Sequence, residues 1–453
     1  MKERLSSKLG TIPIPKLIFQ VSLPIAVSST VQALYNIVDG IYVSGISEDA
    51  LTATSLFFSV NMIMVAVSSG MAAGLNTLLS FSLGRKRGDR ASQIIITGML
   101  LSVVMSALFA CLGFFGARTY YGIFQANDSI THYGVEYMTI CTVFFLPSAL
   151  SCVLERVLQA TNHSSLSMAA QMSGAVVNII LDPILIFGKL GLPALGIKGA
   201  AIATVLGQTV AALLALVFNI TKNEDFHLSF RTYQFRLSTI VDIYRVGLPV
   251  TVMQVIGTVM TFSINKIFII FSSTAVTFFG IYYKIQMFVF MQIFAFGQGN
   301  TTIVAYNRGA RQYGRIRKSI RCTMLVNVCI AFLGMLVFQL FTDPLISLFK
   351  PTQELLVMGR HALRIISVIF PIEAICVTFS YSFQGLGHGG LSLIHSFIRQ
   401  LVFRVPFAYI LAVTVGLDAV WYAFIIAEVA ALILTSFMYY SVRKKELMQT
   451  DGQ

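Results

Sequence analysis

Apolar residues fill most of the chain in long runs, and short polar segments separate these runs. Many runs reach the roughly 20 residues that a helix needs to cross a hydrocarbon core of about 30 Å. The pattern predicts an all-α membrane protein with twelve transmembrane helices. The predicted helices are 15–44, 51–82, 92–117, 135–158, 168–188, 197–220, 240–271, 276–305, 319–341, 360–385, 394–415 and 418–440.

The twelve predicted helices form two halves that resemble each other. "VSLPIA" from Val21 matches "VGLPVT" from Val246, and "QATNHSSLSM" from Gln159 matches "QGLGHGGLSL" from Gln384, so both pairs lie 225 residues apart. Toward the end of the halves the offset becomes 220. Parallel repeats of six helices, related by an axis along the membrane normal, are a transporter architecture. The predicted domains are an N-lobe (1–220), a cytoplasmic linker (221–239) and a C-lobe (240–453).

Composition and charge support a membrane protein with a defined orientation. Hydrophobic residues make up 56% of the chain and charged residues only 11%, whereas soluble domains carry about 25% charged residues. The net charge of +13 comes from Lys and Arg in alternate loops, such as "GRKRGDR" after the second helix and "RGARQYGRIRKSIR" after the eighth. This is the positive-inside pattern. It predicts that both termini are cytoplasmic, and it explains the basic charge better than a nucleic-acid-binding surface does.

Two aspartates interrupt apolar helices of the first half. Asp39 lies in "YNIVDGIYVSG" and Asp182 in "NIILDPILIFG". The repeat aligns Asp39 with Ile264, or with Asn265 after a one-residue slip, and it aligns Asp182 with Phe407. A charged side chain at the centre of a bilayer costs about 3 kcal/mol on insertion scales, so such residues usually face a cavity and carry function. The structural alternative is that each acid extends to an interface or caps a neighbouring helix.

The residues around Asp182 indicate an ion site. Asn178 precedes Asp182 by four residues and shares its helix face. Pro183 removes a backbone N–H and clashes with the preceding turn, so we expect a bend there. If helix packing brings Asp39 close, the two carboxylates cannot both ionise cheaply without a cation. The pair is predicted to hold either a proton or Na⁺, with Thr204 as a further oxygen ligand.

Several motifs together resemble the multidrug and toxic compound extrusion (MATE) family, and most of all its bacterial DinF/MepA-like branch. They are "PIAVSSTVQALYNIVDGIYVSG", "NIILDPILIFG", "GIKGAAIATVLGQ", "VAYNRGARQYGRI" and "YSFQGLGHGGLSL". The resemblance implies a V-shaped pair of six-helix lobes in a bacterial cell membrane. It also implies export of lipophilic, mostly cationic compounds in exchange for H⁺ or Na⁺. The ion site of the N-lobe carries over to Asp39, Asn178, Asp182 and Thr204.

Polar and aromatic residues of the second half are candidates for a substrate cavity. Glu373 follows Pro371 by two residues, where NorM-type members of the family carry an acid of a C-lobe cation site, but the partner acid of their seventh helix has no match here. The alternative is that Glu373 pairs with an internal cation, for which the candidates are Lys266, Lys284, Arg399 and Arg404. Aromatic faces attract organic cations, and Met adapts to varied shapes. The remaining cavity candidates are Gln254, Asn265, Met253, Phe262, Phe288 and Met291.

Three functions are alternative explanations of this sequence pattern. The first is a cation-coupled antiporter for organic cations, and the second is a flippase for lipid-linked or polysaccharide precursors from the same superfamily. The third, a membrane enzyme, lacks a metal cluster, an activated nucleophile or a phosphate-binding loop in the sequence. We therefore expect no enzyme activity, no ATP use and no cofactor beyond the coupling ion. The expected partners are small organic cations and membrane lipid, without nucleic acid, and the expected state is a monomer. The six cysteines lie in apolar segments and are predicted to be buried.

Overall fold

The computed structural model describes residues 8–124, 127–226, 228 and 233–448, and within them the regular structure is helical. Ten helices are long and apolar enough to cross a membrane, and two bent helix pairs bring the total to twelve when each pair counts as one span. The predicted all-α membrane fold is therefore confirmed. The termini and part of the linker (227 and 229–232) lie outside the described residues.

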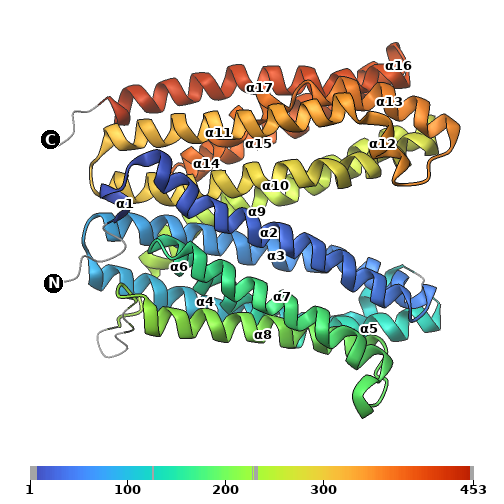
Figure 1. Ribbon diagram of the computed structural model, residues 1–453, viewed down its shortest axis with the longest axis horizontal. Coiled ribbons are helices and arrows are strands. Elements are labelled where there is room, and N and C mark those ends of the chain that lie inside the picture. Colours follow the sequence, from blue (N-terminus) through green and yellow to red (C-terminus); the bar gives the residue numbers. More distant parts are fainter. Residues whose placement is uncertain (1–7, 125–126, 227, 229–232, 449–453) are drawn as a thin grey trace. The chain divides into compact units, whose positions relative to one another are not determined.

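The helices follow the predicted order (Figure 1). The first half holds α1 (Lys8–Thr11), α2 (Ile14–Ser44), α3 (Glu48–Gly84), α4 (Gly88–Ile123), α5 (Asp128–Val143), α6 (Leu146–Ala160), α7 (Ser164–Phe187), the short turn η2 (Lys189–Gly191) and α8 (Ile197–Lys222). The second half holds α9 (Leu237–Phe271), α10 (Ser273–Gly309), α11 (Tyr313–Leu340), α12 (Thr342–Ser347), α13 (Gln353–Ser367), α14 (Phe370–Gly385), α15 (Gly389–Phe397), η3 (Ile398–Arg404), α16 (Val405–Thr414), η4 (Leu417–Ala419), α17 (Val420–Val442) and η5 (Arg443–Leu447).

The fourth and tenth predicted helices are each broken in the middle. The pair α5 and α6 is bent by 44°, and the pair α13 and α14 is bent by 50°. Pro147 and Pro371 stand in the first turn after each break. Proline is tolerated at a helix start because its missing N–H has no intrahelical partner there. The predictions of continuous helices over 135–158 and 360–385 were wrong in this respect, and the break occurs at matching places of the repeat.

The chain packs into two compact units whose borders differ from the predicted lobes. One unit contains Val27–Leu248, and the other contains Gly10–Ala26 together with the chain from Pro249 onward. The start of α2 thus packs with the second half, and the start of α9 packs with the first. The linker prediction placed the division at 221–239 because polar composition marks a loop but does not show which helices pack together.

Two glycines related by the repeat allow the starts of α9 and α2 to pack closely against α3 and α10. A Cβ atom on Gly74 of α3 would lie 2.0 Å from the backbone oxygen of Ile243 in α9. A Cβ atom on Gly299 of α10 would lie 2.1 Å from the Ser22 hydroxyl in α2. Small residues allow membrane helices to approach at backbone distance. The same offset of 225 residues relates Gly74 to Gly299 and Ser22 to Gly247, so the repeat duplicated this packing as well.

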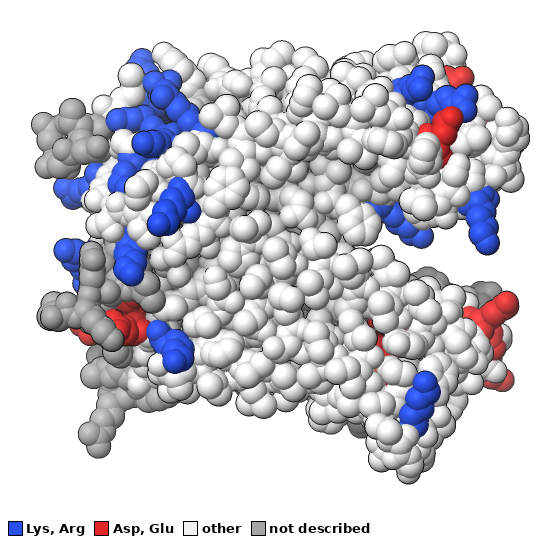
Figure 2. All heavy atoms as spheres, viewed as in Figure 1, with Lys and Arg blue, Asp and Glu red and all other residues white. Residues whose placement is uncertain are grey.

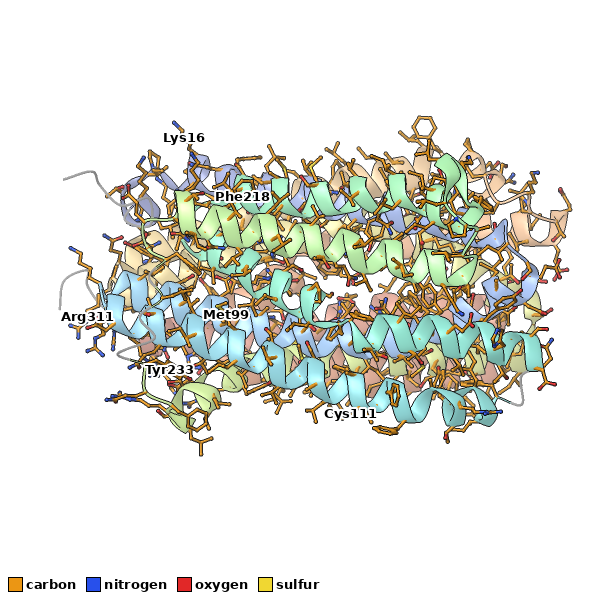
Figure 3. All side chains as sticks on the ribbon, turned by 90° about the horizontal axis from the view of Figure 1, so that it is seen from below. Lys16, Met99, Cys111, Phe218, Tyr233 and Arg311 are labelled. Carbon is orange, nitrogen blue, oxygen red and sulfur yellow. The ribbon has the colours of Figure 1, made fainter. Side chains whose placement is uncertain are left out.

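Charged side chains are concentrated toward the helix ends. Within the second unit, Lys and Arg gather near the ends, and the stretch between them is almost free of charged side chains on the face shown in Figure 2. Apolar side chains project from all sides of the helices (Figure 3). Cys111 on α4 and Cys329 on α11 are exposed, and of the six cysteines only Cys376 is fully buried. The prediction of buried cysteines was wrong for Cys111 and Cys329 because an outward face of a membrane helix is also apolar.

Candidate ion-coupling site

Two carboxylates of the first unit meet between α2 and α7. Asp182 is completely buried, and Asp39 is half-buried. The two carboxyl groups lie close enough to interact with each other. The two acids predicted from the sequence are therefore brought together, although Asp39 and Asp182 lie 143 positions apart in the chain.

Asn178 joins the acid pair to α8. Its Nδ2 lies 3.4 Å from Asp182 Oδ1 and 3.4 Å from Thr204 Oγ1. The opposite amide orientation satisfies both ends of the side chain. In that orientation the nitrogen donates to Asp182 Oδ2 at 3.3 Å, and the oxygen accepts from the Thr204 backbone N–H at 3.2 Å. All four residues predicted for the site thus lie in one cluster.

The contact between α7 and α8 depends on two glycines. The helices lie side by side (Figure 1). A Cβ atom on Gly174 would lie 2.6 Å from the Gly207 oxygen, and one on Gly207 would lie 2.7 Å from the Gly174 oxygen and 3.0 Å from Asn178 Cβ. The backbones of α7 and α8 therefore approach more closely than a side chain at either glycine would allow. This approach brings Thr204 of α8 within reach of Asn178 on α7.

The helix that carries Asp182 continues through Pro183 and ends at Phe187. Gly188 then adopts a left-handed conformation with φ of 69°, which terminates the helix without a Cβ penalty. Because Pro183 has no N–H, the carbonyl one turn earlier loses its helical partner. The position of Pro183 therefore leaves a free backbone carbonyl near Asp182, as expected. The helix nevertheless continues through Pro183 without a break.

Two tyrosines complete the polar surroundings and were missed by the sequence reasoning. Tyr35 lies near both Asp39 and Asp182. Its position four residues before Asp39 was a usable signal, since residues four apart share a helix face. Tyr137 of α5 is buried and lies beside Thr204. No local pattern identifies Tyr137, because its contact depends on packing between helices.

Among the described residues, the acid pair has no salt-bridged counter-charge. In the described part of the chain, no Lys, Arg or His side chain forms a salt bridge with Asp39 or Asp182. One oxygen of Asp39, Oδ1, is buried without a hydrogen-bond partner among the described residues. Carboxylate, amide and hydroxyl oxygens are suited to hard cations such as Na⁺. Two carboxyl groups in contact can also share a proton.

The second unit places its candidate residues differently. Glu373 of α14 is paired with Arg399, with 3.0 Å between Glu373 Oε1 and Arg399 Nη1. Of the other proposed partners, Lys266 and Lys284 are exposed, and Arg404 is paired with Glu428. The remaining candidates lie on α9 (Met253, Gln254, Phe262 and Asn265) and on α10 (Phe288 and Met291).

Two of these candidates present aromatic rings at the surface of the second unit. Phe262 and Phe288 are 62% and 45% exposed. The Lys266 ammonium group lies over the Phe262 ring, 5.6 Å from its centroid. The Phe262 face can therefore hold a cation. The role of these side chains as a cavity wall stays a prediction.

These features define a class of protein. A duplicated helical bundle with ten to twelve candidate membrane spans in the described residues, and with a carboxylate pair inside one half, is the architecture of a secondary transporter. The MatE family model matches residues 24–184 and 249–410, one match in each half of the repeat. The chain therefore belongs to the MATE family. It is a multi-pass membrane transporter and not an enzyme.

Relatives with assigned names and solved structures agree with this assignment. The chain is 24% identical over 436 residues to "Multidrug export protein MepA" of Staphylococcus haemolyticus, covering 95% of this chain and 94% of that protein. It is 22% identical to "Probable multidrug resistance protein YoeA" of Bacillus subtilis, with 94% and 93% covered. The outward-facing structure of a multidrug resistance MATE family transporter matches with a TM-score of 0.92 and 25% identity over 99% of this chain and 100% of that one.

Proposed function

We propose that the protein exports lipophilic organic cations in exchange for H⁺ or Na⁺, which binds at Asp39 and Asp182. The observation that carries the proposal is the contact between two intramembrane carboxyl groups without a fixed cationic partner in the described residues. Such a pair is costly when empty and ionised. Binding of one monovalent cation leaves a single negative charge shared by the pair and so lowers this cost.

Exchange follows if loading and unloading favour different helix arrangements. A loaded site lets Asp39 of α2 approach Asp182 of α7 without repulsion. An unloaded, doubly ionised site favours separation of the two carboxylates. An ion can shift a two-state bundle only by its differential affinity for the two states, and this pair supplies that difference. Asn178 and Thr204 offer further oxygens if Na⁺ is the ion.

The proposed substrate class, lipophilic organic cations, is supported by the names of relatives and by the attraction between cations and aromatic faces. Two relatives carry names that refer to multidrug export or resistance. Aromatic faces such as those of Phe262 and Phe288 attract organic cations. We further propose that the protein acts as a monomer in the cell membrane, with both termini in the cytoplasm and no cofactor other than the coupling ion. A flippase for lipid-linked precursors is the alternative that the experiment must separate.

The test is efflux of a fluorescent organic cation such as ethidium from membrane vesicles that contain the purified protein. A pH gradient and a Na⁺ gradient are imposed separately. Efflux driven by one of them and absent from empty vesicles supports the proposal. Equal ethidium retention under both gradients, together with transfer of a lipid-linked sugar between leaflets, would instead establish the flippase.

Replacing Asn178 with Ala tests whether the ion is Na⁺. The substitution removes one oxygen ligand and the link to Thr204. For Na⁺-driven efflux, we expect the half-saturating Na⁺ concentration to rise about tenfold, which corresponds to ~1.4 kcal/mol. The matched control is Asn327→Ala in the second unit, where Asn327 Nδ2 donates to Thr378 Oγ1 at 2.9 Å in a buried position. An equal rise in both variants would mean that Asn178 acts through stability alone.

A further inference from the structure

The second unit contains a buried network of four charged side chains. Arg399 Nη1 lies 3.0 Å from Glu373 Oε1 and 2.9 Å from Glu428 Oε1. Arg404 Nη2 lies 2.5 Å from the same Glu428 oxygen. The Glu428 side chain is fully buried, and those of Arg404, Glu373 and Arg399 are only 6%, 10% and 14% exposed. The network therefore lies inside the helix bundle, away from solvent.

A local π-helix brings the two arginines to one glutamate. Residues five apart point about 140° apart on an α-helix of 3.6 residues per turn. Arg399 and Arg404 are five apart, but both lie in the π-helical segment η3, whose wider turn pairs residue i with i+5. The segment leads directly into Pro406 of α16, which lacks an N–H and so favours a local change of helix type.

The network is electrically balanced. Two glutamates and two arginines give a net charge of zero when all four are ionised. Removing one partner from a buried ion pair leaves an uncompensated charge, which is strongly unfavourable. Arg399 matters most for the balance because it contacts both acids, while Arg404 contacts Glu428 alone and stacks on Phe424, with 4.8 Å from its guanidinium carbon to the ring centroid.

The first unit has a different arrangement of charges. The repeat aligns Thr204 of the ion site with Phe424, the residue beneath Arg404. It aligns Asp182 with Phe407, and Asp39 with the fully buried Ile264 or, after a one-residue slip, with Asn265. The first unit thus holds Asp39 and Asp182 on α2 and α7 without a salt-bridged arginine among the described residues. The second unit holds two acids on α14 and α17, and its two arginines lie in η3, the segment that the repeat aligns with α7.

We propose that Arg399 is a built-in counter-cation that occupies the place of an exchangeable ion beside Glu373 and Glu428. The second unit therefore stays neutral through the cycle, and ion exchange is confined to the first unit. This inference rests on the proposed exchange at Asp39 and Asp182. It makes Arg399 a residue that determines how many ions move per cycle.

The inference predicts that Arg399→Gln creates a new cation site. Glu373 and Glu428 would then face Arg404 alone, and one negative charge would be uncompensated. The variant should bind about one additional proton or Na⁺ per protein, because a buried charge of this kind is neutralised rather than left free. Arg399→Lys keeps the charge and should bind no additional ion.

The experiment uses purified full-length protein in detergent with Asp39→Asn as the background, which removes the first site. Binding of radioactive Na⁺ and proton uptake reported by a pH-sensitive dye are measured for Asp39→Asn, Asp39→Asn/Arg399→Gln and Asp39→Asn/Arg399→Lys. About one equivalent gained in the Gln variant only is the expected result. A folded Gln variant that gains no ion and no proton overturns the inference.

A further variant allows the inference to be tested even if Arg399→Gln unfolds the protein. Glu373→Gln/Arg399→Gln is neutral again, since Glu428 still faces Arg404. It should be more thermally stable than Arg399→Gln and should not gain the extra ion. Equal instability of the two variants would show that Arg399 acts by packing, against the inference. Because these comparisons do not use the first site, they stand even if the unmodified protein proves not to exchange ions at Asp39.

Discussion

Asp39→Asn is expected to abolish gradient-driven efflux while leaving a folded protein that still binds substrate. The Asn side chain is neutral at every pH, so it mimics the loaded state and cannot release an ion. Without repulsion between two ionised carboxylates, α2 is not driven away from α7, and the transport cycle stops. We expect at least about a hundredfold loss of driven efflux, equivalent to ~2.8 kcal/mol at the rule of tenfold per ~1.4 kcal/mol. Asp182→Asn should have the same effect, because the two carboxyl groups are in direct contact.

The measurement is efflux against a fixed gradient from vesicles that hold equal amounts of each variant. Asp418→Asn is the control, since Asp418 is an exposed acid outside the site. Glu373→Gln should keep its dependence on the gradient as long as the protein is folded, because Arg399 already neutralises Glu373. If both aspartate variants pump normally and Glu373→Gln does not, the coupling site lies in the second unit and the assignment to Asp39 and Asp182 is wrong.

Gly207→Val is expected to reduce both stability and transport. The new Cβ would lie 2.7 Å from the Gly174 oxygen and 3.0 Å from Asn178 Cβ, so α8 must move away from α7. Overpacking of this kind costs about 1–3 kcal/mol or more. The movement also takes Thr204 out of reach of Asn178, which is only 3.4 Å away in the native packing. Ion affinity should therefore fall together with stability.

The readouts are the thermal midpoint of the detergent-purified protein and the half-saturating concentration of the coupling ion. Gly116→Val is the matched control, because a Cβ atom on this glycine of α4 meets no heavy atom within 4 Å. It should change neither quantity appreciably. Retention of native stability and ion affinity by Gly207→Val would show that the close approach of α7 and α8 is dispensable.

Properties that depend on local composition could be read from the sequence. The apolar runs predicted the membrane spans because the cost of exposing a helix to lipid is set by its own side chains. The two halves could be predicted because the repeat is found by comparing segments of the sequence directly with one another. Asp39 and Asp182 were found as intramembrane acids for the same reason, since each is conspicuous against its own neighbours and its counterpart in the other half.

The tertiary structure decided which of these residues meet. Tyr137 reaches Thr204 from α5, and four cations were equally plausible partners of Glu373 until packing selected Arg399. The π-helix at Ile398–Arg404 turned two arginines toward one acid, whereas regular α-helical spacing would have separated them. The starts of α2 and α9 joined the opposite halves of the chain through close helix contacts. Such contacts join residues far apart in the chain, and their geometry follows from the fit of whole helices rather than from any local pattern.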